Sequence, residues 1–348
     1  VHPPIAAVSG LQDSGNQEHS LHILSGDIGG TKTTLALFES NGTASRVLAR
    51  KTFSSRQHDS LEGVLRQFLT KDMPAQDVAC FGLAGPIHDG ICLTTNLPWR
   101  VEAKNLSGEF GIPQVFLIND LEANAWSIAQ LPEKDLHTLH PGKPDAAGNR
   151  SIVSAGTGLG EAGLFWDGTQ HIPFASEGGH ASFSPTNPLE IALLEYLLKK
   201  HDRVSWELVV SGMGLINIHD FMLNHYGEAA PEWLAGEMAE GDAAAAISKA
   251  ALESRCPLCV KALDMFVHLY GVEAGNHAFK IMATGGVYIG GGIAPKILDA
   301  LEKPAFLEGF FAKGGMEPLM RDMPVHVILN ADAALYGAAF YARNRIAG

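Results

Sequence analysis

The sequence predicts an α/β fold that is divided into two domains, each built around a mostly parallel sheet. Its 348 residues exceed the usual size of one domain. Short apolar runs of strand length alternate with segments of helical periodicity, which is the pattern of parallel strands joined by helices. A strand, a glycine- and threonine-rich loop and a second strand follow one another twice, near residue 27 and near residue 157. The repeat suggests that each domain presents one such loop.

The composition excludes several classes of protein. At 46% apolar and 18% charged residues, the chain has an ordinary soluble composition. The net charge of −13 and the lack of a basic stripe argue against a nucleic-acid partner. No run of about 18 apolar residues and no signal-peptide pattern occurs, so no membrane partner is expected. Four cysteines are too few for a disulfide scaffold, which indicates a reducing, cytoplasmic location.

The first loop lies within Leu21–Phe38, where two apolar runs predict antiparallel strands around a glycine turn. Glycines let backbone N–H groups approach an anion closely, and neighbouring hydroxyl and ammonium groups add donors. A carboxylate at the strand end is suited to hold a hydrated metal ion beside a phosphate. An ordinary hairpin with a Gly–Gly turn is the alternative. The candidate residues are Asp27, Gly29, Gly30, Thr31 and Lys32.

The rest of the first half alternates strands with helices, and an acidic residue follows its last strand. Strands are expected at Ala44–Thr52, Val78–Leu83, Ile91–Thr95 and Val115–Ile118, and helices at Ser60–Leu69 and Val101–Phe110. Ligands of α/β sheets bind at the carboxyl ends of strands. Asp120 follows the last of these strands, so it is a candidate catalytic base. A helix N-cap is the alternative for Asp120.

After a polar segment at 141–150, the strand–loop–strand pattern restarts with Ser151–Ser154, the loop Ala155–Glu161 and Ala162–Trp166. Two such loops facing each other could hold one polyphosphate from two sides, with Gly156, Thr157 and Gly158 as the second set of contacts. Further elements follow in order. Helices are expected after an Asn187 cap and at Met213–Tyr226, Ala243–Glu253, Pro257–Met282 and Asp332–Arg345, and strands at Gly285–Ile289 and Val325–Leu329.

Glu177 and His180 flank two glycines in FASEGGHASF, which brings both side chains into one turn. Three interpretations stay open: hydrogen bonding to a polyol, metal ligation, or no role. A sugar suits the pair well, because a carboxylate accepts from hydroxyls and an imidazole donates or accepts. Asn96 is a weaker candidate of the same kind. Glu207 is a further candidate for binding a sugar, and the alternative is an ordinary residue on a solvent-exposed helix face.

Two further motifs are weak signals. Cys256 and Cys259 have the spacing of half a zinc site, but no second pair follows, so no zinc is expected. The backbone at Gly290–Gly292 could lie close to a bound nucleotide, although a glycine run alone is not specific for nucleotide binding.

In combination and order, these residues resemble the bacterial-type glucokinase family of the hexokinase/actin-like ATPase superfamily, from about Leu21 to Arg345. The motifs are SGDIGGTKT, LAGPI, TTN, FLINDLEANAWSI, AGTGLGEAGL, SEGGHASFSP, ELVVSGMGL and GGVYIGGGIAP. The opening DIGGTK also resembles the related repressor/open-reading-frame/kinase group. That group carries a cysteine-rich zinc motif after its GH step, and none follows His180.

The resemblance implies a two-domain actin-like ATPase (ribonuclease H-like) fold with an inter-domain cleft. It implies ATP-dependent phosphorylation of D-glucose at the C6 hydroxyl, with Asp120 as the general base and Mg²⁺ held by Asp27 through water. It implies sugar contacts from Asn119, Asp120, Glu177, His180 and Glu207, to which we add Asn96. The loops around Asp27–Thr31 and Gly156–Gly158 would hold phosphates, and Gly290–Gly292 would lie near the nucleoside. A homodimer is the expected assembly.

We expect a flexible tail over residues 1–20, a small domain of 21–129 plus 330–348, and a large domain of 130–329. Two alternatives stay open for the function. One is a kinase for another hexose, such as mannose or an amino sugar, or one that uses polyphosphate as donor. The other is a sugar-responsive regulator without activity, but a Pro- and Gly-bearing tail of 20 residues cannot supply a helix-turn-helix.

Overall fold

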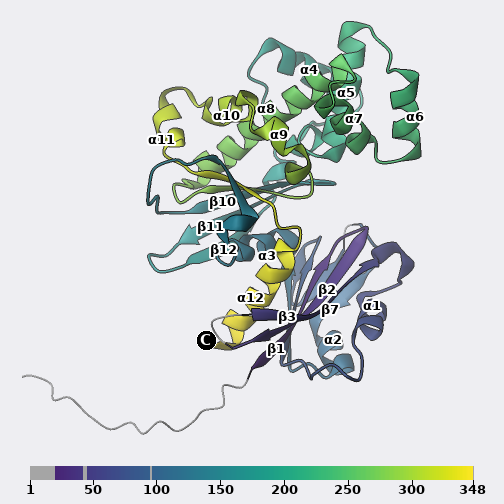
Figure 1. The fold of residues 1–348 in the computed structure, drawn as a ribbon, viewed down its shortest axis with the longest axis vertical. Coiled ribbons are helices and arrows are strands. Elements are labelled where there is room, and N and C mark those ends of the chain that lie inside the picture. Colours follow the sequence, from purple (N-terminus) through teal and green to yellow (C-terminus); the bar gives the residue numbers. More distant parts are fainter. Residues whose placement is uncertain (1–19, 42–44, 95, 348) are drawn as a thin grey trace, which may run out of the picture.

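A computed structural model describes residues 20–41, 45–94 and 96–347. It has two main sheets with helices around each (Figure 1). The fold class is therefore α/β, as the sequence predicts. The expected N-terminal tail falls outside the described residues, except for Ser20.

The first sheet has five strands in the order β3-β2-β1-β4-β8. Their bounds are β1 Leu21–Ile28, β2 Lys32–Ser40, β3 Ser45–Ser54, β4 Val78–Leu83 and β8 Gln114–Asn119. The strands β1, β4 and β8 run parallel, with Asp27 beside Gly82 and Leu83 beside Asn119. Their carboxyl ends therefore meet at one edge of the sheet, which is where ligands of α/β proteins gather.

A small sheet and short helices complete this part of the chain. Their bounds are η1 Ser55–Gln57, α1 Leu61–Phe68, β5 Ile87–His88, β6 Ile91–Leu93, β7 Arg100–Glu102 and α2 Ala103–Phe110. The helix expected from Val101 begins later, at Ala103, because Val101 pairs with Cys92 across β6 and β7. The start of α1 is as expected, since the Ser60 hydroxyl accepts a hydrogen bond from Gly63 N.

The second sheet has six strands in the order β12-β11-β10-β13-β14-β9. Their bounds are β9 Leu136–His140, β10 Arg150–Ala155, β11 Leu159–Trp166, β12 His171–Ser176, β13 Val287–Gly290 and β14 Val325–Ile328. The loop expected over Ala155–Glu161 is shorter, because β11 already begins at Leu159. The two edge strands β9 and β12 were not predicted. The parallel strands β10 and β13 end together, with Ser154 beside Gly290.

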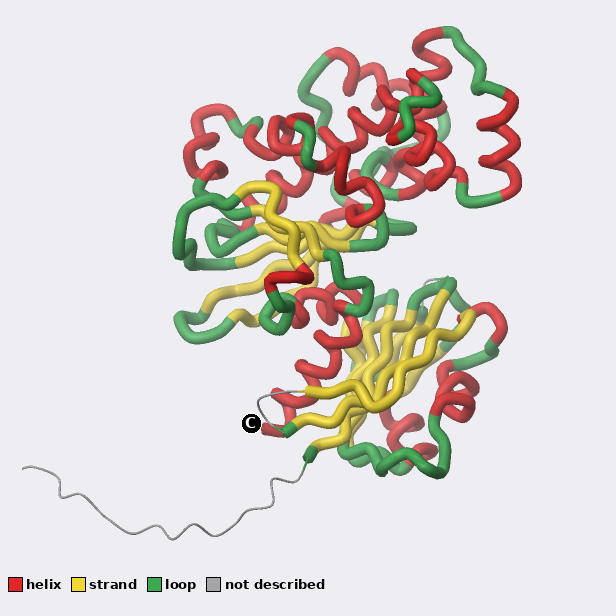
Figure 2. Tube along the Cα trace, viewed as in Figure 1, coloured by secondary structure: helices red, strands yellow, loops and turns green. Residues whose placement is uncertain are grey.

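Most helices of the second half cover one face of this sheet, as Figure 2 shows above the yellow strands. Their bounds are η2 Glu133–Asp135, η3 Gly178–His180, α4 Pro188–Leu198, η4 Trp206–Leu208, α5 Gly212–Tyr226, α6 Glu232–Glu240, α7 Ala243–Leu252, α8 Pro257–Ile281, η5 Ala294–Ile297, α9 Leu298–Leu301, α10 Pro304–Phe311, η6 Gly314–Met316 and α11 Glu317–Arg321. The predicted cap of α4 is confirmed: the Asn187 side chain accepts from Glu190 N at 3.0 Å. The long helix α8 packs against α5, α7 and α10 and is buried along most of its length.

Two helices lie between the sheets: α3 Asp120–Ser127 and α12 Ala333–Ala347 (Figure 1). The chain returns through α12 to the first sheet, where the Ser25 hydroxyl donates to Leu335 O at 2.7 Å. The ring of Trp126 on α3 meets that of Tyr341 on α12 at a centroid distance of 5.5 Å. Because α3 also contacts β10, β11 and β12, it joins the two halves of the molecule.

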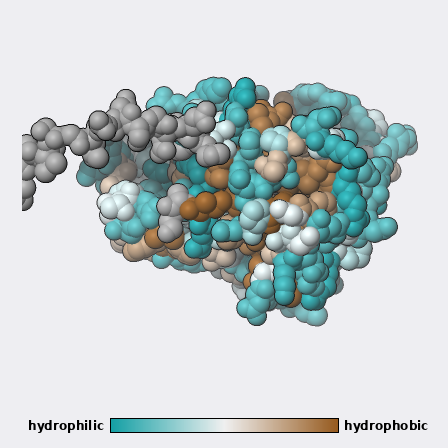
Figure 3. All heavy atoms as spheres, turned by 90° about the horizontal axis from the view of Figure 1, so that it is seen from below, coloured by the Kyte–Doolittle hydropathy of each residue, from teal (hydrophilic) through white to brown (hydrophobic). Residues whose placement is uncertain are grey.

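The surface seen from below is hydrophilic around its rim, with hydrophobic residues gathered toward the middle (Figure 3). Within the described ranges, no helix has the length and apolar character needed to cross a bilayer.

Candidate active site

Asp27 lies near the carboxyl end of β1, beside Gly82 of β4. Burial, together with the charges of Asp120 and Asp332, raises the pKa of Asp27 to about 7. The carboxyl groups of three acidic residues therefore repel one another at this edge of the sheet. A divalent cation would relieve that repulsion, and Mg²⁺ commonly binds to one or two carboxylates while it keeps waters and phosphate oxygens as its other ligands. The residues present fit Mg²⁺ on this ground.

Asp120 is the first residue of α3, directly after β8. The N-cap of α3 is Asn119, whose side-chain oxygen accepts from Leu121 N at 2.8 Å. The alternative in which Asp120 is the cap is therefore wrong. Burial raises the pKa of Asp120 to about 6, the Leu121 N–H bond opposes this rise, and the charge of Glu177 adds to it. At neutral pH the carboxylate is thus mostly ionised and basic enough to accept a proton.

The first glycine loop is a tight turn between β1 and β2. Gly29 N donates to Lys32 O at 2.9 Å, and the Ser55 hydroxyl donates to Gly29 O at 2.7 Å. The side chains of Thr31 and Lys32 are exposed, so they are accessible to a ligand.

Asn96 lies against this loop. A Cβ on Gly30 would come 2.5 Å from the Cβ of Asn96, which shows how closely the two residues pack. Asn96 is therefore a neighbour of the expected phosphate loop, and its side chain is exposed.

The second glycine loop closes on itself through a bond from Gly156 N to Gly158 O at 2.9 Å. Gly156 O accepts from Gly212 N at 2.8 Å, so the loop lies at the first residue of α5. Thr157 at its tip is exposed. The N-terminus of a helix favours anions, which suits a loop that would hold phosphates.

Glu207 supports the same loop. Its Oε2 accepts from Leu159 N at 3.0 Å, and a Cβ on Gly158 would come within 2.4 Å of this oxygen and collide with it. Glu207 is half-buried in η4. The alternative of a solvated helix-face residue is therefore wrong for Glu207.

The run Gly290–Gly292 lies directly beside this loop. Gly291 has a φ of +82°, and a Cβ there would collide with Ala155 O, so the backbone can pass only because the residue is glycine. The Tyr270 hydroxyl accepts from Ala155 N at 3.1 Å and lies 3.1 Å from Gly290 O. One side chain of α8 thus supports both strand ends.

Glu177 and His180 frame η3. Their side chains approach to 3.9 Å and are 80% and 58% exposed. The turns η3 and η4 are in contact, which brings this pair toward Glu207, and the electrostatic effect of Glu177 on Asp120 brings it toward the base. Four of the expected sugar contacts therefore lie in one region.

No group of three or more His, Cys, Asp or Glu residues in the described part of the chain is arranged to hold a metal ion. The metal interpretation of Glu177 and His180 therefore lacks a further ligand among those residues. Cys256 and Cys259 are buried free thiols at the start of α8. Burial raises the pKa of Cys259 to about 12, so its thiol is kept protonated.

Two features of the site were not predicted from the sequence. Arg50 on β3 binds Asp332 before α12 through two hydrogen bonds of 2.8 and 2.6 Å. Glu161 is buried in β11 beneath η3. The only sequence signal for Glu161 is a charged residue inside an apolar strand, and the 282 positions between Arg50 and Asp332 leave no local signal for that pair.

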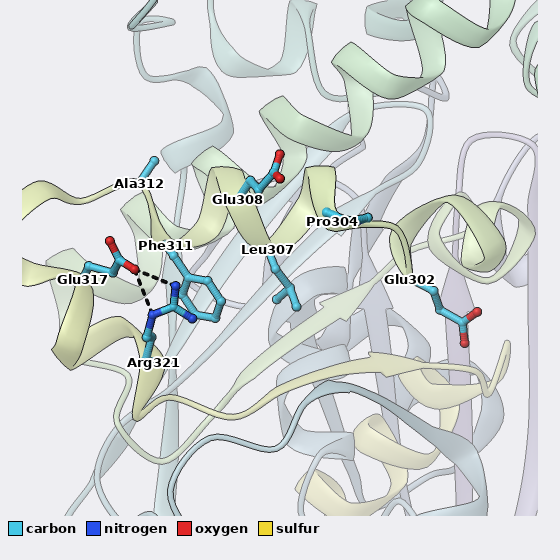
Figure 4. Close-up of a pocket in the computed structure, with 8 residues that line it drawn as sticks. All are labelled: Glu302, Pro304, Leu307, Glu308, Phe311, Ala312, Glu317 and Arg321. Atoms are coloured by element: carbon cyan, nitrogen blue, oxygen red, sulfur yellow. Dashed lines mark hydrogen bonds and ion pairs between the residues drawn. The ribbon is translucent and has the colours of Figure 1, made fainter.

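A hollow of about 610 Å³ lies elsewhere, between α10 and α11. Figure 4 shows its acidic rim and the Arg321–Glu317 ion pair, and Arg321 also lies 4.4 Å from the centre of the Phe311 ring. None of the expected site residues lines this hollow, so it is separate from the candidate active site.

Comparisons with known proteins point to one family. A family model described as glucokinase matches residues 24–345. A glucokinase of Nostoc punctiforme is 43% identical over 335 residues, which cover 92% of this chain and 98% of that protein.

Two solved structures are similar in fold. The glucokinase of an Antarctic psychrotroph has a TM-score of 0.79 at 31% identity, over 93% of this chain and 99% of that one. A ROK family glucokinase from Streptomyces griseus, solved with glucose and AMPPNP, has a TM-score of 0.63 at 21% identity, over 93% and 99%. Both agree with the actin-like kinase fold that the sequence motifs imply.

Proposed function

Because this chain belongs to the glucokinase family, we propose that it transfers the γ-phosphoryl group of ATP to the C6 hydroxyl of D-glucose, with Asp120 as the general base. The observation that carries this proposal is the position of Asp120 at the carboxyl end of β8, within the electrostatic reach of both Asp27 and Glu177. Base, phosphate region and sugar region thus meet at one carboxylate.

Asp120 acts on the sugar hydroxyl. Its carboxylate accepts the C6 hydroxyl proton as the oxygen attacks phosphorus, while the bond to the leaving ADP breaks. The bond from Leu121 N to Asp120 Oδ1, 2.9 Å long, fixes the carboxylate and leaves the other oxygen for the sugar. Phosphoryl transfer depends mainly on such positioning and on electrostatic stabilisation.

Asp27 would hold Mg²⁺ through water. When bound, this ion offsets charge on the phosphate oxygens. The backbone N–H groups of the first loop, with Thr31 and Lys32, would bind the terminal phosphates. The loop Gly156–Gly158 would hold the phosphates from the other side, and Gly290–Gly292 would let the nucleoside approach the backbone.

Specificity for glucose would come from polar groups that need a hydroxyl partner. The proposed contacts are Asn96, Asn119, Asp120, Glu177, His180 and Glu207. Once the domains have closed over the sugar, a site that pairs each hydroxyl would discriminate strongly against analogues that lack one, because polar groups buried by the closure would be left without partners. For Asn119 the N-cap engages the amide oxygen, so its NH₂ group is the part that would meet the sugar.

We further propose that the domains 21–129 plus 330–348 and 130–329 close over glucose, which would keep water away from the γ-phosphate. The reaction is assigned to the cytoplasm, in keeping with four free, buried cysteines among the described residues. The assembly is proposed to be a homodimer, and light scattering of the purified protein would test it.

The deciding experiment is an ADP-release assay across glucose, mannose and amino sugars, with a parallel assay of glucose 6-phosphate formation from polyphosphate. We expect the highest kcat/KM for glucose with ATP. A higher kcat/KM for another hexose, or turnover with polyphosphate alone, would replace the proposed substrates. No turnover with any pair would leave the sugar-responsive regulator as the function.

A further inference from the structure

A buried acidic residue lies directly beneath the turn that carries Glu177 and His180. Glu161 on β11 is only 2% exposed, and a Cβ on Gly178 would collide with its Oε2. The turn η3 therefore rests on the Glu161 carboxyl group, with no space between them. The backbone of Gly179 packs closely on Leu159 O, so both glycines of η3 lie against β11.

A second carboxyl group, that of Glu273 on α8, interacts with Glu161. Glu273 is fully buried, and its Oε2 accepts from the Asn276 side chain at 2.9 Å. Oε1 of Glu161 and Oε1 of Glu273 are both buried and have no hydrogen-bond partner among the described residues. Two buried carboxyl oxygens without partners are costly, and a proton shared between them would lower that cost.

His277, one turn further along α8, ties Glu161 in place. Its Nδ1 lies 3.2 Å from Glu161 Oε2, and its Nε2 lies 3.1 Å from Ala162 O. The imidazole thus bridges the carboxyl group and the backbone of β11. Tyr270, Glu273 and His277 fall on one stripe of α8, since residues three, four and seven apart share a helix face.

The surroundings of Glu273 favour its protonated form. Burial and, after it, the charge of Glu161 raise the pKa of Glu273 to about 8, against the opposing effects of Asn276 and Lys280. Lys313 approaches from the loop after α10, where burial lowers its pKa to about 8. The titratable groups that interact with the pair are Tyr270, His277 and Lys280 on α8 and Lys313 after α10.

We propose that Glu161 and Glu273 share one proton and act as a positioning pair that holds the Glu177–His180 turn in its sugar-binding geometry. This inference rests on the proposed role of that turn in binding glucose. Loss of the shared proton leaves two carboxylates facing each other in the interior. Glu161 cannot retreat toward the turn without displacing it, because Gly178 is already in contact. The turn therefore moves, and glucose binds more weakly.

Proton binding at the pair and glucose binding at the turn are then coupled, and such coupling is reciprocal. Raising the pH above about 8 should raise the KM for glucose, and glucose binding near pH 8 should take up protons. The KM for ATP and kcat should change much less, because neither Asp120 nor the glycine loops rest on this pair.

The test is calorimetric titration of the full protein with glucose at pH 8, in two buffers of different protonation enthalpy. The parent protein should take up as much as about half a proton for each glucose bound, and Glu273→Gln should take up none. Between pH 7 and pH 9 the parent KM for glucose should rise at least about fivefold, while that of Glu273→Gln stays flat. Glu122→Gln is the matched control, because burial also raises the pKa of Glu122, which lies on α3 and should leave the uptake unchanged.

Equal proton uptake by the parent and Glu273→Gln would overturn the proposal, and so would a parent protein that takes up none. If Glu273→Gln does not fold, Glu161→Gln removes the same repulsion from the other side and must flatten the pH dependence. Glu177→Gln, assayed at pH 7, separates the two inferences. An unchanged glucose KM there would refute the role of the turn itself, whereas a raised KM with no effect of Glu273→Gln would refute only the positioning pair.

Discussion

Replacing Asp120 with Asn tests the catalytic proposal in a single variant. Asn keeps the size of the side chain and can still accept from Leu121 N, but it cannot take a proton. General-base catalysis typically contributes about 10²–10⁴-fold to the rate. We therefore expect kcat in an ADP-release assay to fall at least about a hundredfold. Glucose affinity measured by calorimetry should fall far less, because the amide still pairs with a hydroxyl.

The same variant should be at least as stable as the parent. The folded-state pKa of Asp120 rises from 3.8 to about 6, so the stability that its neutral form contributes is lost as the pH rises through 6. At pH 7 the charged group costs at most about 3 kcal/mol on this basis. Asn removes that cost but also loses about 0.3–1 kcal/mol of interaction with the N-terminus of α3. The free energy of unfolding should thus increase by at most about 2–3 kcal/mol.

The pH profile supplies an independent readout. In the parent, kcat/KM should fall about tenfold for each pH unit below 6, because the base becomes protonated. The residual rate of Asp120→Asn should lack this decline. Asp89→Asn is the matched control: the same chemical change in an exposed turn before β6 should change neither rate nor stability. Full activity in Asp120→Asn would refute the mechanism.

Three further predictions follow from the loops and the cysteines. Glu207→Ala should raise the KM for both glucose and ATP about 10- to 100-fold. The reason is that Glu207 holds the phosphate loop at Leu159 N and lies beside the turn that carries Glu177 and His180. A raised KM for glucose alone would show that the loop does not depend on Glu207. Gly291→Ala should destabilise the fold by at least about 1 kcal/mol, because residue 291 has a left-handed backbone and lies against Ala155 O. Gly292→Ala is the control, since a Cβ there meets open space and should leave the stability unchanged. Thermal unfolding would measure both variants. Elemental analysis should find no stoichiometric zinc, and a zinc signal that disappears in Cys256→Ser would contradict this.

Helices and strands whose ends are marked by neighbouring residues in the sequence were predicted well. The strand Val78–Leu83 is confirmed at both ends, because a short apolar run between polar turns leaves few alternatives. The cap of α4 is also confirmed, since Asn187, Pro188 and Glu190 each satisfy a separate requirement of a helix start. Such signals depend on residues only a few positions apart.

Elements decided by distant partners were predicted less well. The segment Arg100–Glu102 forms a strand rather than the start of a helix, because β6 pairs with it. The edge strand β9 was missed, since Leu136–His140 becomes a strand only beside β14. Intrinsic propensity is a weak guide where pairing with another strand decides.

The same distinction holds for the site. Asp120 could be proposed as the base from the sequence, because strand ends in an α/β sheet are privileged positions. The support beneath the site could not, since Glu161 meets Gly178 and His277 only after β11, η3 and α8 are packed together. Residues that touch ligands occur in recognisable motifs, whereas residues that hold them in place are assembled from several elements.

The charges explain why this arrangement suits a kinase better than a stable scaffold. Asp27, Asp120 and Asp332 repel one another at the edge of the first sheet, and only Asp332 has a cationic partner, Arg50, among the described residues. The carboxylates of Asp27 and Asp120 are therefore costly to bury without ligands. On the proposed mechanism, a hydrated metal ion would relieve the first and a sugar hydroxyl would satisfy the second. The stability that the ligand-free fold forgoes would then contribute to binding the substrates.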